Sequence, residues 1–180
     1  MILWTIGHST RTAQEFSELL GAHGIEQLID VRRFASSRRH PQFSRDTLRN
    51  HLAANTIGYV HLPELGGRRE PKPDSINIGW REPGFRGYAD YMQTAAFESA
   101  LLRLVDAAAG QPSAMMCAEA NWRSCHRGLV ADALKVRGIE VIHIADSGKT
   151  EAHPFTKPAR IEAGALTYAA PPPAQQQLGL

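Results

Sequence analysis

The sequence has few cysteines, no long hydrophobic segment and no secretory signal, and each of these absences excludes a class of protein. Two cysteines among 180 residues cannot build the disulfide framework of a small secreted domain. No apolar run approaches the roughly 18 residues that a membrane-spanning helix needs. The N-terminus lacks the basic and apolar regions of a secretory signal. We therefore expect a cytoplasmic protein that does not bind membranes.

The length and composition fit one ordinary globular domain. A chain of 180 residues can bury a hydrophobic core but is short for two domains. Hydrophobic residues make up 43% of the chain and charged residues 21%, which excludes a disordered or fibrous protein. The functional groups must therefore be sought on a single domain.

The net charge of +2 conceals an uneven distribution of charge along the chain. Residues 32–86 hold eleven basic and five acidic side chains, a net of +6, whereas the remainder carries −4. Arginine outnumbers lysine by sixteen to four, and its planar guanidinium suits phosphate or carboxylate. The expected partner is an anionic small molecule or a nucleic acid, although a solvated arginine-rich surface fits the same charges.

Short apolar runs alternate with helical patterns, and this alternation predicts an α/β fold. Thr12 and Glu15 form a capping-box pattern before one helix, and residues 125–137 have the pattern of another. The fold expected is a single domain with a mainly parallel sheet of about five strands and helices on both faces, the layering of Rossmann-like and flavodoxin-like proteins. We expect the strands at residues 2–6, 27–31, 59–62, 113–118 and 140–144.

Polar side chains collect where the predicted strands end. Ligands of open parallel sheets bind outside the carboxyl ends of the strands, so these residues form one candidate site. Each residue alone suits a structural anchor, and the whole set also suits a polar network that closes the sheet without a ligand. In chain order they are His8, Ser9, Asp30, Arg32, Glu64, Cys117, Glu119, Cys125, His126 and Arg127.

Cys125 is the most suggestive of these residues for chemistry. A thiol at a helix N-terminus, with Arg127 nearby, is favoured in its thiolate form. We expect Cys125 to act as a nucleophile or redox thiol, with His8 or Glu119 transferring protons. The expected catalytic residues are Cys125, His126, Arg127, Cys117, Glu119, His8 and Asp30. The expected anion-binding residues are Arg32, Arg33, Arg123, Arg86 and Ser9.

A second interpretation concerns the loop after the fourth strand. Cys117 and Arg123-Ser124 fit the pattern Cys-x5-Arg-Ser, which resembles the phosphate loop of cysteine-dependent phosphatases. The loop lacks glycine, however, and Glu119 would place a negative charge beside the phosphate. A phosphatase therefore remains a possible interpretation of this pattern, but not the preferred one.

A metal site is a third interpretation of the same residues. Cys117, Cys125 and His126, with Glu119 or His8, are acceptable ligands for zinc. The two cysteines are too far apart in sequence for the close pair of a structural zinc site. We therefore predict no metal ligand and leave the cofactor unknown.

A non-catalytic binding module for nucleic acid or a nucleotide is the fourth interpretation. Arginines would contact the phosphates, and Trp80, Phe85 and Tyr88 would stack on bases. No signature of a known nucleic-acid-binding fold accompanies these residues. The catalytic interpretation is therefore preferred.

Several motifs occur in a fixed order within residues 1–146. They are Thr5-Ile6-Gly7-His8-Ser9, Asp30-Val31-Arg32, Leu65-Gly66-Gly67, residues 85–92, Cys117-Ala118-Glu119, Cys125-His126-Arg127 and His143-Ile144. Together they resemble the bacterial and archaeal "domain of unknown function" family numbered 488. The resemblance implies one α/β domain over residues 1–146 with the motifs grouped at one site, and it implies no activity. We expect a loop-rich extension at residues 147–168 and a disordered proline- and glutamine-rich tail at residues 169–180.

Overall fold

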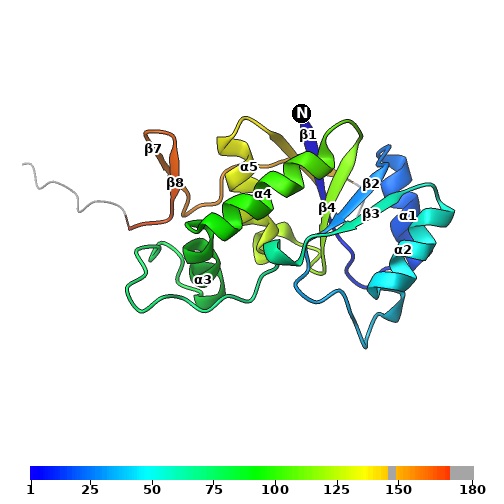
Figure 1. The fold of residues 1–180 in the computed structure, drawn as a ribbon, viewed down its shortest axis with the longest axis horizontal. Helices are drawn as coiled ribbons and strands as arrows, with labels where there is room; N and C mark the ends of the chain where they lie inside the picture. The colour runs from blue at the N-terminus through cyan, green and yellow to red at the C-terminus, as the bar shows by residue number, and fades with distance from the viewer. Residues whose placement is uncertain (146–148, 171–180) are drawn as a thin grey trace, which may run out of the picture.

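The computed structural model describes residues 1–145 and 149–170, and its centre is a six-stranded sheet between two layers of helices (Figure 1). Five strands are parallel, and the sixth joins one edge antiparallel, so the predicted α/β fold with a mainly parallel sheet is confirmed. The expected boundary after residue 146 lies outside the described residues, and so do all but the first two residues of the tail expected at 169–180. In sheet order the strands are β3 (Gly58–His61), β2 (Gln27–Asp30), β4 (Ser113–Cys117), β1 (Ile2–Gly7), β5 (Glu140–Ile144) and β6 (Thr150–Ala152).

Helices cover both faces of the sheet because successive strand residues point to opposite sides. Leu28 and Met116 belong to one hydrophobic cluster and their neighbours Ile29 and Met115 to another, so each face has its own core. The first core is covered by α1 (Ala13–Ala22) and α2 (Arg45–Ala54). The second is covered by α4 (Ala95–Ala108) and α5 (Arg127–Val136), with α3 (Pro83–Met92) preceding α4. None of the described helices is long and apolar enough to cross a membrane.

The strand order places β4 between β2 and β1. The chain leaves β1 and β2 toward α1 and α2 on one face, and it leaves β4 toward α5 on the other (Figure 1). Such a switch point is where open parallel sheets bind ligands. The carboxyl end of β4 is therefore the place in this fold where a site is expected.

Local sequence signals had two different outcomes. The capping box before α1 is confirmed, since Thr12 Oγ1 accepts from the Glu15 amide at 3.1 Å and Glu15 accepts from the Thr12 amide at 2.8 Å. The prediction that a helix begins at Cys125 is wrong. A 3-10 turn at Trp122–Ser124 precedes an extended Cys125, whose amide donates to the Trp122 carbonyl, and α5 begins at Arg127.

Residues 149–170 pack on the α5 side of the sheet. β6 pairs with β5, and a hairpin of β7 (Arg160–Glu162) and β8 (Ala165–Thr167) follows. Tyr168, just after β8, is buried in the core under α4 and α5. This segment therefore contributes side chains to the same interior as the end of β4.

Candidate functional site

The polar residues expected at one site form two clusters on opposite faces of the sheet. Both clusters lie at the carboxyl ends of the strands, and the backbone joins them where the His8 amide donates to the Cys117 carbonyl at 2.9 Å. The cysteine cluster, on the face of α4 and α5, consists of Cys117, Cys125, His126 and Arg127. The Asp30–Arg32 cluster, on the face of α1 and α2, consists of His8, Asp30, Arg32 and Tyr59.

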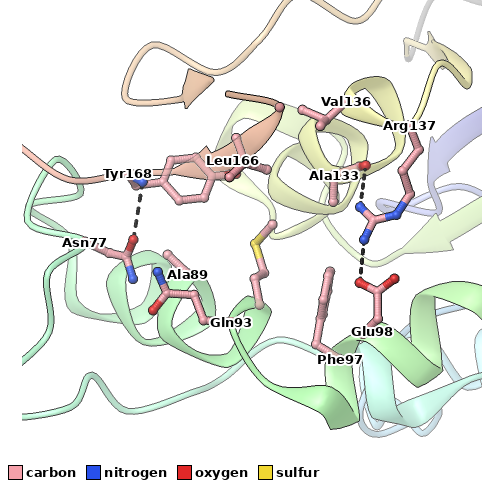
Figure 2. Close-up of a pocket in the computed structure, with 13 residues that line it drawn as sticks. Asn77, Ala89, Gln93, Phe97, Glu98, Ala133, Val136, Arg137, Leu166 and Tyr168 are labelled. Carbon is pink, nitrogen blue, oxygen red and sulfur yellow. Dashed lines mark hydrogen bonds and ion pairs between the residues drawn. The ribbon is translucent and has the colours of Figure 1, made fainter. Parts of the chain in front are cut away.

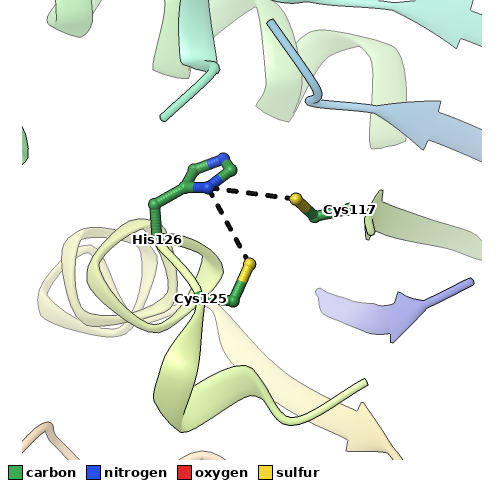
Figure 3. A group of neighbouring side chains, drawn as sticks. All are labelled: Cys117, Cys125 and His126. Carbon is green, nitrogen blue, oxygen red and sulfur yellow. Dashed lines mark hydrogen bonds between the residues drawn. The ribbon is translucent and has the colours of Figure 1, made fainter. Parts of the chain in front are cut away.

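The two sulfur atoms and one imidazole of the cysteine cluster face one another (Figure 3). His126 Nδ1 lies 3.9 Å from Cys117 Sγ and 3.8 Å from Cys125 Sγ. Both cysteines are free thiols, and they are only 7% and 4% exposed respectively. The strand end supplies Cys117 and the segment before α5 supplies the other two, which is why residues eight and nine positions apart meet.

Arg127 is the fourth residue of the cysteine cluster, and its side chain is buried beside Cys125. Its side chain is 1% exposed, and its Nε donates to Cys125 Sγ at 3.4 Å. The other described hydrogen bonds of its guanidinium go to Thr5 Oγ1 at 3.2 Å and to the carbonyl oxygens of Glu119 and Ala120. A buried guanidinium needs a nearby negative charge, and Cys125 is the described partner that can provide one.

The two thiols share protons unequally. Burial by itself raises the pKa of Cys125, but the hydrogen bond with Cys117 and the charges of Arg127 and His126 lower it well below its usual value. The hydrogen bond to Cys125 and burial raise the pKa of Cys117 well above the usual value. The favoured state is therefore a Cys125 thiolate that accepts the S–H of Cys117.

A glycine turn and a tyrosine cover the cysteine cluster. A Cβ atom at Gly67 would lie 2.9 Å from His126 Nδ1, so a larger residue there would push against this imidazole. The ring of Tyr88 lies 5.1 Å from that of His126, and its hydroxyl donates to the Leu65 carbonyl. Within the described part of the chain, His126 Nε2 is buried and has no hydrogen-bond partner. Such an unpaired buried nitrogen calls for an explanation.

The Asp30–Arg32 cluster is closed by its own hydrogen bonds. Arg32 Nε and NH2 donate to Asp30 at 2.9 and 2.6 Å, and Tyr59 donates to the same carboxylate at 2.7 Å. His8 stacks on Phe43 with ring centroids 4.2 Å apart, and burial lowers its pKa to about 4. The guanidinium expected to bind an anion thus already has a carboxylate partner.

The structure places the other predicted site residues in environments that the sequence does not reveal. Glu119 is exposed and contacts Arg127 through its backbone carbonyl. Ser9 has a left-handed backbone (φ 51°), and its amide donates to the Ala118 carbonyl. Arg86 Nε, on α3, is buried without a hydrogen-bond partner among the described residues.

The arginine of the phosphatase-like pattern is turned outward. Arg123 forms an ion pair with Glu151 and lies over the Trp122 ring, with its guanidinium carbon 4.3 Å from the ring centroid. Its side chain is about half exposed. The guanidinium beside a cysteine is therefore that of Arg127, next to Cys125, and the pattern Cys-x5-Arg-Ser has no counterpart in these contacts.

Among the described residues, Cys117, Cys125 and His126 are the group whose ligand atoms lie close enough together to hold a metal ion, within 4.8 Å of one another. Two thiolates and an imidazole suit zinc, which takes a fourth ligand. The buried Arg127 guanidinium beside Cys125 Sγ would place a cation next to that dication. Arg127 already donates to Cys125 Sγ, so this sulfur has a cationic partner without a metal ion.

A cavity of about 380 Å³ lies between α3, α4, α5 and β8, away from the cysteine cluster (Figure 2). Arg137 in its wall pairs with Glu98, and Asn77 accepts from the Tyr168 amide at 3.3 Å. No cysteine or histidine is among the described residues that line this cavity.

A buried polar network behind Arg127 was missed by the sequence reasoning. It contains Thr5, Asp132, His143, His153 and Tyr168. Two signals pointed toward it: Asp132 interrupts the apolar face of the predicted helix, and His143 belongs to one of the motifs. No local pattern in the sequence pointed to His153 or Tyr168.

Comparison with protein families gives one match and two negative results. The model of the family described as "Domain of unknown function DUF488" matches residues 12–134, about two thirds of the chain. The chain matches no curated protein and no solved structure. The matched range contains Cys117-Ala118-Glu119 and Cys125-His126-Arg127, whereas His8, His143 and His153 lie outside it. The chain belongs to the DUF488 family.

Proposed function

We propose that the protein is a cysteine-dependent enzyme that acts on an anionic substrate, with the Cys125 thiolate as the reacting group. The substrate class is a nucleotide, a nucleic-acid-derived compound or another phosphorylated compound. The observation that carries the proposal is the contact between Cys125 Sγ and the buried Arg127 guanidinium. The described partners of Arg127 include no carboxylate, so the thiolate is its counterion.

Cys117 and His126 are placed to manage the protons of the reaction. Cys117 keeps its proton and can donate a hydrogen bond to the thiolate. His126 Nδ1 lies within 4 Å of both sulfur atoms, where it can exchange a proton with either. Its unpaired Nε2 supports a role in which a substrate atom completes its hydrogen bonding.

The exposed arginines near the cluster support an anionic substrate. The glycine turn that touches His126 through Gly67 touches the backbone of Arg33 through Gly66. Arg33 donates to the Arg68 carbonyl at 3.0 Å, and both arginine side chains are exposed. Two cationic side chains thus border the cover of the cysteine cluster, where they would attract a phosphate.

A non-catalytic nucleic-acid-binding module receives less support. Tyr88, one of the three aromatic residues expected to stack on bases, is 1% exposed and donates its hydroxyl to a backbone carbonyl. Trp80 packs against Phe85 and Tyr168. These rings serve the core, so the proposed module would lack its stacking platform.

The proposal is tested by titrating the thiolate of the native protein. A free cysteine has a pKa of about 8.5. We expect the ultraviolet absorbance of the Cys125 thiolate to appear at a pH well below this value and to be absent there in Cys125→Ser. Iodoacetamide should modify Cys125, located by mass spectrometry, in the same pH range. Cys117→Ser is the matched control, because its hydroxyl still donates to the thiolate and the low midpoint persists.

Inorganic phosphate tests the substrate class in the same assay. At constant ionic strength, phosphate should slow the alkylation of Cys125 more than chloride does, and Arg33→Ala or Arg68→Ala should weaken this protection. Ordinary titration of both cysteines would overturn the thiolate, and equal effects of phosphate and chloride would overturn the anionic substrate.

A further inference from the structure

A chain of hydrogen bonds crosses the buried α5 side of the sheet. His153 Nε2 lies 2.9 Å from Asp132 Oδ1, and His153 Nδ1 lies 2.8 Å from His143 Nε2. His143 Nδ1 lies 2.7 Å from Thr5 Oγ1, which also accepts from Arg127 NH1 at 3.2 Å. The chain therefore connects a buried carboxylate with the guanidinium that contacts the Cys125 sulfur.

The carboxylate end of the chain is fixed by further donors. Asp132 also accepts from the backbone amide of Thr156 at 2.8 Å, from the Thr156 hydroxyl at 2.5 Å and from the Tyr168 hydroxyl at 2.9 Å. A side chain that accepts this many hydrogen bonds behaves as an ionised acceptor. It therefore requires His153 to donate its Nε2 proton.

The Asp132 carboxylate and the Arg127 guanidinium, at the two ends of this hydrogen-bond chain, determine where its protons lie. With neutral imidazoles, His153 Nδ1 must accept from His143 Nε2, which leaves His143 Nδ1 to accept the Thr5 hydroxyl proton. Arg127 has no acceptor and donates to the Thr5 oxygen. Burial lowers the pKa of His143 to about 2, so this ring stays neutral. Every buried group in the chain then has a partner.

We propose that His143 and His153 are positioning residues that hold the Arg127 guanidinium against Cys125 through the Thr5 hydroxyl. This inference rests on the proposed function, since its purpose is to maintain the Cys125 thiolate. Neither histidine touches the sulfur. Each acts through its neighbour in the chain, and Thr5 makes the final contact with Arg127.

The C-terminal segment is consequently part of the site rather than an addition to the domain. His153, Thr156 and Tyr168 all follow residue 134, where the family match ends. His153 is fixed from two sides, because its amide donates to the Val141 carbonyl and Lys135 donates to its carbonyl. The fold thus brings residues 149–170 behind Arg127.

The experiment measures the midpoint of the Cys125 thiolate titration in four variants. Thr5→Val removes the acceptor of Arg127, and His143→Phe removes the acceptor of Thr5 while keeping a ring against Trp122. Both should raise the midpoint by about one pH unit, which is about a tenfold loss of thiolate below the midpoint. Thr5→Ser keeps the hydroxyl and should restore the wild-type midpoint. Leu104→Val, in the same core but outside the hydrogen-bond chain, should lower the melting temperature without moving the midpoint.

The other titratable groups near Cys125 Sγ do not account for a change of its titration midpoint in these variants. Replacing His143 removes no charge, because the imidazole is neutral, and the remaining groups are unchanged in all four variants. The titratable and charged groups that face Cys125 are Cys117 from β4, His126 and Arg127 at the start of α5, Tyr88 from α3 and His143 from β5.

The possible results separate the two proposals. An ordinary midpoint in the wild-type protein overturns the proposed function. If the wild-type midpoint is low and neither Thr5→Val nor His143→Phe changes it, the positioning role of the hydrogen-bond chain is overturned and the proposed function stands. The hydrogen-bond chain is also overturned when Leu104→Val raises the midpoint as much as they do, because the shift then reflects loss of packing. Unfolding measurements on every variant confirm that the titrations report folded protein.

Discussion

Two buried arginines lie at the same edge of the sheet, on opposite faces, and they differ in their counterions. Arg32 is bound by the Asp30 carboxylate through two of its nitrogen atoms. Arg127 is bound by the Cys125 sulfur, and its other described bonds go to neutral oxygens. The first guanidinium is neutralised by a carboxylate, whereas the second is neutralised only when a thiol has lost its proton.

The two clusters also differ in how their titratable groups are protonated. In the Asp30–Arg32 cluster, burial and then the charge of Asp30 raise the pKa of Tyr59, and burial lowers that of His8, so both stay neutral near neutral pH. In the cysteine cluster one proton is shared between two thiols. The Asp30–Arg32 cluster therefore holds its charges in a fixed pair, and the cysteine cluster is the one for which we propose a reaction.

The largest expected effect comes from breaking the carboxylate pair. Arg32→Met leaves Asp30 buried without its cation and should lower the free energy of unfolding by about 3–5 kcal/mol, measured by urea denaturation. Arg127→Met is the matched variant on the other face. It should cost less, about 1–3 kcal/mol, because Cys125 can take up a proton and become neutral.

The double variant Asp30→Asn with Arg32→Met controls for lost packing. It should recover part of the stability lost in Arg32→Met, because no buried charge remains unpaired. Equal losses in Arg32→Met and Arg127→Met would mean that both arginines are held by equally permanent anions. That result would contradict the contrast between a carboxylate and a thiol.

The sequence was sufficient to predict the layered fold and most of the residues at the strand ends. Apolar runs of strand length alternating with helical patterns predict parallel strands, and polar residues that follow such strands must gather at one edge. The motif Cys125-His126-Arg127 was correctly grouped with Cys117 for this reason. Element order along the chain was enough for this inference.

The division into two faces was not predicted, because it depends on the alternation of side chains at each strand end. Asp30 points to the face of Leu28, whereas Cys117 points to the face of Met115. A shift of one residue in either strand would reverse the face. The network through His153 depends in addition on pairing between β5 and the segment after residue 149, which no local pattern specifies.

Acid should destabilise both faces through their neutral histidines. His8 and His143 have folded pKa values of about 4 and about 2, below the unfolded value of 6.5. Below pH 6.5 the unfolded chain binds these protons and the folded protein does not, so stability is full above this pH and falls beneath it. The expected loss is about 1.4 kcal/mol per pH unit for each histidine.

Urea denaturation between about pH 5 and 6.5 isolates this effect, because carboxylates titrate mainly at lower pH. His8→Asn should reduce the slope by the contribution of one proton and leave the Cys125 thiolate midpoint unchanged, since His8 lies on the other face. A slope that His8→Asn does not alter would show that this histidine is protonated in the folded protein.

The smallest expected effect distinguishes Arg127 from the arginine of the phosphatase-like pattern. Arg123 and its partner Glu151 are each about half exposed, and exposed ion pairs contribute about 0–1 kcal/mol. Arg123→Ala should therefore change the unfolding free energy by less than about 1 kcal/mol and leave the thiolate midpoint of Cys125 in place. Arg127→Met should raise that midpoint, because it removes the guanidinium that contacts the sulfur. If Arg123→Ala raised the midpoint as far as Arg127→Met does, the exposed Arg123 would have to contact the thiol in solution. The contact between Cys125 and the buried Arg127 would then not be what stabilises the thiolate.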